Sequence, residues 1–304
     1  MASRRRRPVR RQARNRRAGL PLIIAVVLVL VVIIFVVERQ FAGYFGGRTP
    51  AHHVAVTSPT PTTSETPSPL ESISPAPSPS PAPSGAPRIA IIIDDCGYSL
   101  PRDLVFLKLP IPLTLSILPM TPHGKEVAAD AVAAGKAVML HIPMEPFSSG
   151  AHPGPGEIST EMTDAQIDTQ LNADIASLPP LPGANNHMGS KASSDPRVMR
   201  DVIDILKHND MFFIDSMTAM TTVGASTARE LGVPTAERDV FLDDSVNVPY
   251  IEGQIRQLEA TAKKNGTAIA IGHPFPATYQ ALETMVPQME AAGFAFVDAK
   301  TLVK

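Results

Sequence analysis

The chain has 304 residues and a formal net charge of −2, although its first 17 residues carry nine arginines and no acid. Without that +9 the rest of the chain carries −11, from 18 Lys and Arg against 29 Asp and Glu, which argues against binding to a nucleic-acid backbone. The single cysteine, Cys96, excludes an intramolecular disulfide.

Residues 20–37 form an unbroken run of eighteen uncharged, mostly β-branched apolar residues behind the basic residues 1–19. As a helix they span roughly 27 Å, close to the hydrocarbon thickness of a bilayer. Arginines favour the cytoplasmic side, so we expect one transmembrane helix in the cytoplasmic (inner) membrane, N-in, with the C-terminal domain in the periplasm. A cleaved signal peptide and a buried core helix are the alternatives. The length of the run, its poor cleavage site and its lack of a polar face favour an uncleaved anchor.

Residues 38–87 are expected to form a disordered linker, because positions 57–87 are almost entirely Pro, Ser, Thr and Ala. Proline favours polyproline II, so this segment is typical of a semi-stiff stalk. The remaining 217 residues, 88–304, are enough for one domain with a sizeable core.

Short apolar runs alternate with amphipathic stretches throughout residues 88–304. The runs predict buried strands at 89–93, 113–118, 137–140, 211–214, 240–242, 268–271 and 294–297, with a short strand before Asn185. Helices are predicted at 124–134, 163–177, from 196, at 251–264 and at 277–292, with caps at Thr163 and Asp195. Strands buried on both faces and separated by helices indicate an α/β fold with a mostly parallel sheet. A distorted (β/α) barrel of seven or eight strands fits best, and a doubly wound open sheet is the alternative.

Ionisable and polar residues follow nearly every predicted strand at its carboxyl end, which is the functional edge of such folds. They are Asp94 and Asp95, His141 and Glu145, Asn186, His187, Ser190 and Lys191, Asp215, Asp243 and Asp244, and His273. Random surface placement would scatter such residues over both ends of the sheet.

Each of these residues also has a purely structural interpretation. Asp94 and Asp95 could begin a turn, although two adjacent carboxylates repel each other, which favours one as a metal ligand and one as a base. His141 could be a satisfied core residue. Asp215 could either orient a histidine or cap the next helix, and Asp243 and Asp244 could support a histidine or initiate a helix.

The chemistry of this set is that of a catalytic divalent metal site. Oxygen and nitrogen ligands without a thiolate suit zinc, while manganese, cobalt and nickel stay open. Such a metal can activate water for attack on an amide carbonyl, with an aspartate as base and a histidine as acid.

Five motifs in order resemble the divergent polysaccharide deacetylase (YibQ-like) family over about residues 88–304. They are Ile-Ile-Ile-Asp94-Asp95-Cys-Gly-Tyr, His141-Ile-Pro-Met-Glu-Pro146, Asn-Asn-His187-Met-Gly-Ser190, Phe-Ile-Asp215-Ser and Ile-Gly-His273-Pro. That family is similar to the NodB-type carbohydrate esterases, which have a distorted (β/α) barrel and remove acetyl groups from chitin-like or peptidoglycan sugars with a divalent metal.

The resemblance implies a role for each matched residue. Asp94 is expected as the base, Asp95 and His141 as metal ligands, His273 as the catalytic histidine and Asp215 as the aspartate that tunes it. Glu145 stands where the family has a second metal-binding histidine, so either Glu145 or His187 completes the site. The usual Arg-x-Pro-Tyr motif of the family is not evident. From their polar character and place at a strand end, and not from the resemblance, Asn186, Ser190 and Lys191 are expected to bind substrate.

The favoured hypothesis is therefore a membrane-anchored, metal-dependent hydrolase that removes acetyl groups from an envelope polysaccharide, peptidoglycan being the nearest. The alternative is a non-catalytic glycan- or partner-binding envelope protein on a degenerate deacetylase fold. A peptidase or phosphoesterase on the same scaffold is a third hypothesis. A serine nucleophile is disfavoured, because Ser190 and Ser193 lack the Gly-x-Ser-x-Gly context.

Overall fold

The computed structural model describes residues 85–304. The expected cytoplasmic tail and transmembrane helix, and all but the last residues of the linker, lie outside this range. Among the described residues, no helix has both the length and the apolar character needed to cross a membrane.

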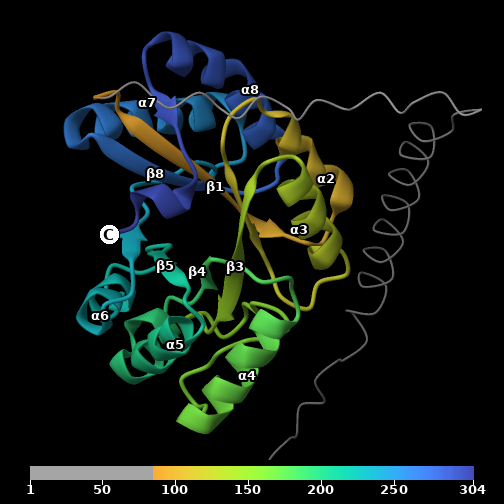
Figure 1. The fold of residues 1–304 in the computed structure, drawn as a ribbon, viewed down its shortest axis with the longest axis vertical. Helices are drawn as coiled ribbons and strands as arrows, with labels where there is room; N and C mark the ends of the chain where they lie inside the picture. Colours follow the sequence, from red (N-terminus) through yellow and green to blue (C-terminus); the bar gives the residue numbers. More distant parts are fainter. Residues whose placement is uncertain (1–84) are drawn as a thin grey trace, which may run out of the picture. The chain divides into compact units, whose positions relative to one another are not determined.

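The core of the domain is one curved sheet in which every strand pair is parallel (Figure 1). The strands are β1 (Arg88–Cys96), β2 (Thr114–Ile117), β3 (Ala137–Met144), β4 (Gly183–Met188), β5 (Phe212–Asp215), β6 (Thr235–Glu237), β7 (Val240–Phe241), β8 (Thr267–Gly272) and β9 (Ala295–Phe296). Their order is β6-β5-β4-β3-β2-β1-β8-β7, and β9 pairs with the start of β1.

The two edges of this sheet are joined by a single short segment. β6 pairs with β5 at one edge and β7 pairs with β8 at the other, yet only residues 238 and 239 separate them in the chain. The N–H of Arg238 donates to the carbonyl of Asp215, and that of Asp239 donates to the carbonyl of Ile269. Residues 235–241 therefore link the two edges of the curled sheet into an incomplete barrel, in which β6 and β7 do not pair with each other.

Helices cover the outside of this barrel, as Figure 1 shows. They are α2 (Leu100–Leu104), α3 (Gly124–Ala133), α4 (Asp164–Ala176), α5 (Pro196–His208), α6 (Gly224–Leu231), α7 (Val248–Asn265) and α8 (Pro276–Ala291), with short 3₁₀ turns at Val105–Lys108, Ala192–Ser194 and Ala299–Leu302. The predicted capping box of Thr163 with Gln166 and the Asp195 cap are both confirmed.

Two apolar clusters fill the two sides of the sheet. The larger one packs the helices on its outer face. The smaller one fills the inside of the barrel with alternate strand residues such as Ala90, Ile92, Ile269 and Ile271, and the 3₁₀ turn at Ala299–Leu302 contributes to it. This period of two determines which polar residues at the strand ends continue into the barrel mouth.

The α/β fold with a parallel, barrel-like sheet that the sequence predicts is confirmed in the form of a curled half-barrel, because β6 and β7 at the two edges are linked by the chain but do not pair with each other. The curling of the sheet favours this fold over the doubly wound open sheet. β6, α2 and α6 were not predicted from the sequence. Each is short, with at most eight residues, and lacks a clear apolar period.

Candidate metal centre and surrounding site

The barrel mouth brings together side chains from four strands that are far apart in the sequence. Asp94 continues the inward positions of β1 after Ala90 and Ile92, and His141 follows Met139 in β3 by the same period. His273 follows Ile269 and Ile271 just after β8. His187 comes from the end of β4. The strand-end clustering predicted from the sequence is thus present for these residues.

Asp95 reaches the same mouth only because β1 is irregular at this point. In a regular strand its side chain would face away from that of Asp94. The register between β1 and β2 shifts between Ile93 and Cys96, and Asp95 has a positive φ of 58°. A β-bulge redirects side chains in this way, and such backbone strain clusters at functional sites.

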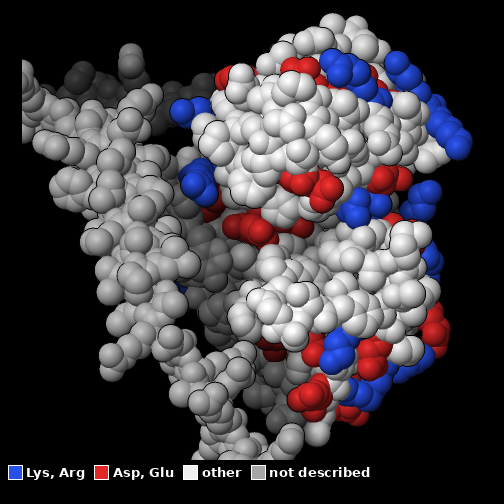
Figure 2. All heavy atoms as spheres, turned by 180° about the vertical axis from the view of Figure 1, so that it is seen from behind, with Lys and Arg blue, Asp and Glu red and all other residues white. Residues whose placement is uncertain are grey.

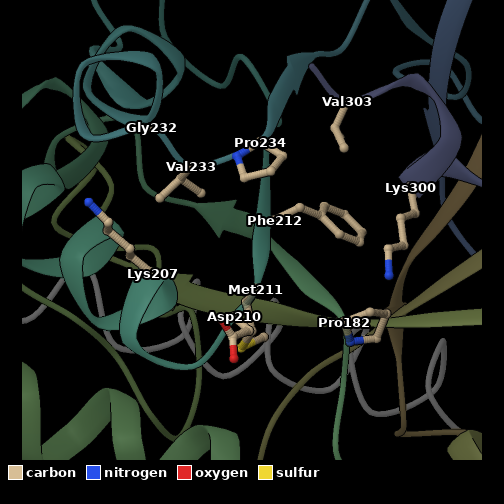
Figure 3. Close-up of a pocket in the computed structure, with 10 residues that line it drawn as sticks. All are labelled: Pro182, Lys207, Asp210, Met211, Phe212, Gly232, Val233, Pro234, Lys300 and Val303. Atoms are coloured by element: carbon tan, nitrogen blue, oxygen red, sulfur yellow. The ribbon is translucent and has the colours of Figure 1, made fainter.

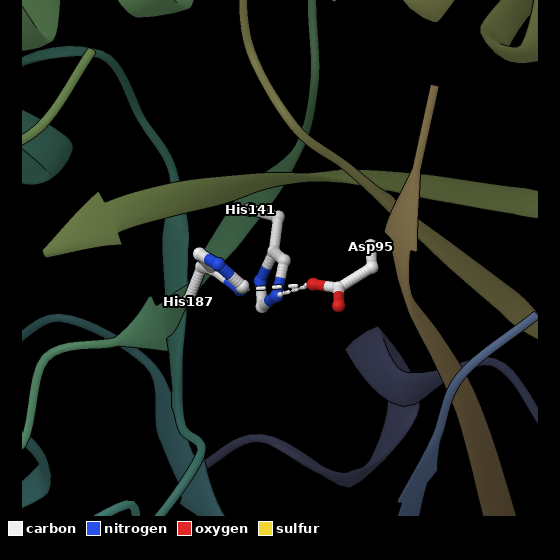
Figure 4. A group of neighbouring side chains, drawn as sticks. All are labelled: Asp95, His141 and His187. Atoms are coloured by element: carbon white, nitrogen blue, oxygen red, sulfur yellow. Dashed lines mark ion pairs between the residues drawn. The ribbon is translucent and has the colours of Figure 1, made fainter. Parts of the chain in front are cut away.

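Asp95, His141 and His187 form what we call the candidate metal triad, which is drawn in Figure 4. Oδ1 of Asp95 lies 3.2 Å from Nε2 of His141 and 2.8 Å from Nδ1 of His187. Two ligands bound tetrahedrally at about 2.1 Å are about 3.4 Å apart, so these separations fit a shared cation.

The state of the Asp95 oxygen supports this interpretation. Oδ1 is buried, and its polar neighbours at close range among the described residues are the two imidazoles, neither of which is assigned to it as a hydrogen-bond donor. Burial alone would raise the pKa of Asp95, but the two histidines lower it well below its ordinary range. An unsatisfied carboxylate oxygen at the convergence of two imidazoles fits a divalent metal.

Asp94 lies beside His141 and is more buried than Asp95 or His187. Its side chain is almost fully buried, and Oδ2 is 3.5 Å from Nε2 of His141. Burial raises its pKa, while His141 and His273 act in the opposite direction. For His141, burial alone would lower the pKa, and the nearby Asp94 and Asp95 carboxylates raise it.

His273 is held by Asp243. Its Nδ1 lies 2.8 Å from Oδ1 of Asp243, and its backbone N–H donates to Oδ2 of the same carboxylate at 2.6 Å. The Thr278 hydroxyl also donates to Oδ2, and the ring of Phe241 packs edge-on against the imidazole. Burial alone would lower the pKa of His273, but the Asp243 carboxylate and the other acids raise it to about 9. Nε2 faces the triad, 3.8 Å from Oδ2 of Asp95.

The expected pairing of Asp215 with His273 is wrong. Asp215 lies on the outward face of β5, where Oδ1 accepts the N–H of Met217 and Oδ2 accepts the Thr222 hydroxyl and the N–H of Ala225. It therefore anchors the start of α6, the structural alternative open from the sequence. The carboxylate that pairs with His273, a role expected for Asp215, is that of Asp243.

Glu145 does not join the metal triad. Oε1 accepts from Nζ of Lys191 at 2.6 Å, and Oε2 accepts from both the N–H and the hydroxyl of Thr160 at 2.7 Å. Burial alone would raise the pKa of Glu145, but these donors lower it. Between the two candidates for the remaining ligand, the geometry favours His187.

The three residues expected to bind substrate have mainly internal partners. The Asn186 amide is buried and contacts the Met188 carbonyl, the Thr218 hydroxyl and the Ser216 N–H. The Ser190 hydroxyl accepts the N–H of Phe147, and Lys191 pairs with Glu145. Asn185, the first residue of the Asn-Asn-His187 motif, had no predicted role of its own, yet it contacts both Asp94 and His141.

Two of the hollows among the described residues lie at different positions relative to the triad. The one in Figure 3, about 470 Å³, is lined by Met211, Phe212 and Pro234 at the amino ends of β5 and β6, and so lies at the opposite end from the triad. A second, about 520 Å³, is lined by Ser216, Phe241, Tyr250 and Gln254 and borders the site through Phe241. The face of the described residues in Figure 2 carries charges of both signs and no continuous basic area.

Comparison with known proteins agrees with the sequence motifs. The family model described as "Divergent polysaccharide deacetylase" matches residues 91–303. The chain is 37% identical over 204 residues to YibQ of Escherichia coli (strain K12), covering 66% of this chain and 63% of that protein. It is 34% identical over 196 residues to a protein of Haemophilus influenzae (strain ATCC 51907 / DSM 11121 / KW20 / Rd), covering 64% and 70%.

A solved structure has a similar fold. The crystal structure of ATU2773 from Agrobacterium tumefaciens C58 matches with a TM-score of 0.69 and 23% identity, over 72% of this chain and 89% of that one. At this identity the match supports the fold alone.

Proposed function

The chain belongs to the divergent polysaccharide deacetylase family, and from this membership we propose that it removes acetyl groups from an envelope polysaccharide by metal-dependent hydrolysis. The observation that carries the proposal is the convergence of the metal triad with Asp94 on one side and the Asp243-held His273 on the other. These groups are what amide or ester hydrolysis needs: a Lewis acid, a base and an acid.

The triad residues Asp95, His141 and His187 would hold the cation. A bound divalent metal, for which zinc suits one carboxylate and two imidazoles, would polarise the acetyl carbonyl. Manganese, cobalt or nickel would suit the same donors.

Asp94 and His273 would carry the protons. Asp94 accepts a proton from water as the water oxygen bonds to the acetyl carbon. His273 gives the proton on Nε2 to the departing nitrogen or oxygen as its bond to that carbon breaks, while Nδ1 stays bonded to Asp243. The products are acetate and the free amine or hydroxyl of the sugar.

The polar hollow beside Phe241 is the proposed place for a neighbouring sugar unit. It offers the aromatic side chains of Phe241 and Tyr250 together with the amide of Gln254. Aromatic faces with a few amide groups suit a ring that has one apolar face and hydroxyl edges.

Membrane anchoring completes the proposal. The basic residues 1–19 and the apolar run 20–37 would hold the domain at the periplasmic face of the inner membrane, near an envelope polysaccharide. Fractionation of cells that express the full chain, compared with a variant lacking residues 20–37, tests this part. Recovery of both in the soluble fraction would contradict it.

Acetate release by the full-length protein tests the activity. Zinc-, manganese-, cobalt- and nickel-loaded samples are incubated with acetylated peptidoglycan and N-acetylglucosamine oligomers. We expect release by the wild type and a loss of roughly 100-fold or more in Asp94→Asn and His273→Ala. The controls are Asp130→Asn and His208→Ala, which alter exposed residues on α3 and α5. No release with any metal, or full activity in Asp94→Asn, would reject the mechanism.

A further inference from the structure

We infer that Asn185 is the positioning residue of the metal centre: it holds His141 with its proton on Nδ1, so that Nε2 is free to bind the metal, and through the same amide it fixes the base Asp94. This inference rests on the proposed function for the roles of Asp94 and the metal. The contacts themselves form one buried cluster, the Asn185 network, whose members are Asp94, Ser116, His141, Asn185 and Ser216.

The orientation of the Asn185 amide follows from its neighbours on the Asp94 side. Nδ2 lies 2.9 Å and 3.1 Å from the two carboxylate oxygens of Asp94 and 3.1 Å from the Ser216 hydroxyl. A flipped amide would place an oxygen against two carboxylate oxygens, which share at most one hydrogen even when the acid is protonated. The nitrogen must therefore face Asp94.

The tautomer of His141 follows from that orientation. With Nδ2 toward Asp94, Oδ1 of Asn185 faces Nδ1 of His141 at 2.7 Å. An amide oxygen only accepts hydrogen bonds, so Nδ1 of His141 must carry a hydrogen. Nε2 then has its lone pair available, and it is Nε2 that lies 3.2 Å from the unsatisfied oxygen of Asp95.

Asn185 has little freedom to adopt another arrangement. Its side chain is fully buried in β4, and the Ser116 hydroxyl donates to Oδ1 at 2.6 Å, beside the His141 bond. Both ends of the amide are therefore occupied. Partners of this kind usually set the ring orientation and basicity of a metal-binding histidine, and their removal costs about 10- to 100-fold in metal affinity.

The Asn185 amide accepts a hydrogen bond from His141 and donates one to Asp94, and a carboxylate could not do both. An aspartate at position 185 could accept from Nδ1 of His141, but it would place a second carboxylate within hydrogen-bond distance of Asp94, where the two would repel. Asparagine accepts on one side and donates on the other. Asn185→Asp therefore separates the two roles.

The test measures tautomer and metal binding on the full-length protein, without turnover. Histidine ring nitrogens are labelled with ¹⁵N, and His141→Gln identifies the His141 signals. Long-range ¹⁵N–¹H spectra are recorded without metal at pH 9 and again with one equivalent of zinc. We expect His141 to show a protonated Nδ1 in both spectra of the wild type.

Three variants then locate the cause. Asn185→Ala is expected to lose the single tautomer and to bind zinc about 10- to 100-fold more weakly. Asn185→Asp is expected to keep the His141 tautomer while losing acetate release. Asn209→Ala, which removes an amide at the end of α5 that donates to the Ile205 carbonyl and lies outside the Asn185 network, is the control and is expected to leave both the tautomer and zinc affinity unchanged.

A wild-type His141 protonated on Nε2, or an Asn185→Ala protein with unchanged tautomer and zinc affinity, would overturn the inference. If Asn185→Ala does not fold, the inference is tested by which ring nitrogen of His141 is protonated in the wild type and in Asn185→Asp. Failure of the proposed function looks different, because it appears as absent acetate release by a wild type whose tautomer and zinc binding are as expected.

Discussion

Asp243 binds His273 twice, through its ring Nδ1 at 2.8 Å and through its backbone N–H at 2.6 Å. The first contact orients the imidazole and favours its protonated form, and the second fixes where the loop after β8 leaves the sheet. The position of His273 thus depends on a residue from the segment after β7, on the opposite side of β8 from β1.

Replacing Asp243 with Asn should reduce turnover by roughly 100-fold or more, because His273 loses the charge that keeps its proton and orientation. Zinc content should stay near the wild-type value, since Asp243 lies outside the metal triad. Acetate release and elemental analysis on one preparation check both. Asp215→Asn is the comparison: it should weaken the start of α6 and lower the melting temperature, with kcat of the folded fraction retained. Equal losses of kcat in both variants would contradict the assignment.

Metal binding should distinguish His187 from Glu145. His187→Ala removes a triad member and should weaken zinc binding by more than roughly 100-fold, beyond the usual effect of an outer partner. Glu145→Gln should bind zinc within about twofold of the wild type, because its carboxylate is engaged by Lys191 and Thr160. Competition titration with a zinc chelator measures both. Loss of zinc in Glu145→Gln with retention in His187→Ala would reverse the ligand assignment.

Stability should depend on pH through Asp174 in α4. Its side chain is buried, Oδ1 accepts only from Gln170, and Oδ2 has no donor among the described residues. Burial raises its pKa from 3.8 to about 7, with the Gln170 hydrogen bond acting in the opposite direction. The folded state therefore binds the proton of the Asp174 carboxyl more tightly than the unfolded state does. The stability that this proton gives the folded state is fully present below pH 4 and is lost as the pH rises through about 7.

Asp174→Asn should therefore be more stable than the wild type above pH 7, with a difference that grows by at most about 1.4 kcal/mol per pH unit between pH 4 and 7. Urea unfolding at pH 4, 6 and 8 measures this difference. Asp168→Asn, on the exposed face of the same helix, is the control and should show no such trend. A constant difference at all three pH values would show that Asp174 does not titrate in this range.

The capping box at the start of α4 should contribute measurably to stability. The Thr163 hydroxyl accepts the N–H of Gln166, and the Gln166 side chain accepts the N–H of Thr163. Thr163→Ala should cost about 1 kcal/mol in the free energy of unfolding. Thr169→Ala in the exposed middle of the helix should have a much smaller effect, and urea titration compares the two. Equal effects would mean that the cap adds nothing beyond helix propensity.

Most of the fold and the grouping of several site residues could be predicted from two features of the sequence. These are the spacing of the apolar residues and the position of the polar residues directly after the predicted strands. Apolar runs identified the long strands, and the rule that parallel strands share a carboxyl edge predicted that Asp94, His141, His187 and His273 lie together. The missed elements were too short for a period to be visible.

The error with Asp215 has a definite physical cause. Phe212, Phe213 and Ile214 are all apolar because both faces of β5 are buried, so the sequence did not show which face looked into the barrel. Asp215 is on the outer face, while Asp243 follows the inward-facing Phe241. The prediction that Asp95 faces the site was correct only because a β-bulge, which the sequence does not show, turns its side chain inward. Asn185 stands in the Asn-Asn-His187 motif, but its role was not predicted because that role depends on hydrogen bonds to residues of other strands.

The short segment that links the two edges of the sheet also bears on how the chain reaches this structure. Residues 235–237 need β5 in place and residues 240–241 need β8, so both pairings depend on strands at opposite edges of the sheet. Contacts that join distant parts of a chain form slowly, because the loop between them must first be ordered. Pairing at both edges is thus expected as a late step in folding, and the loop after β7 that carries Asp243 would reach its final position only when that step is complete.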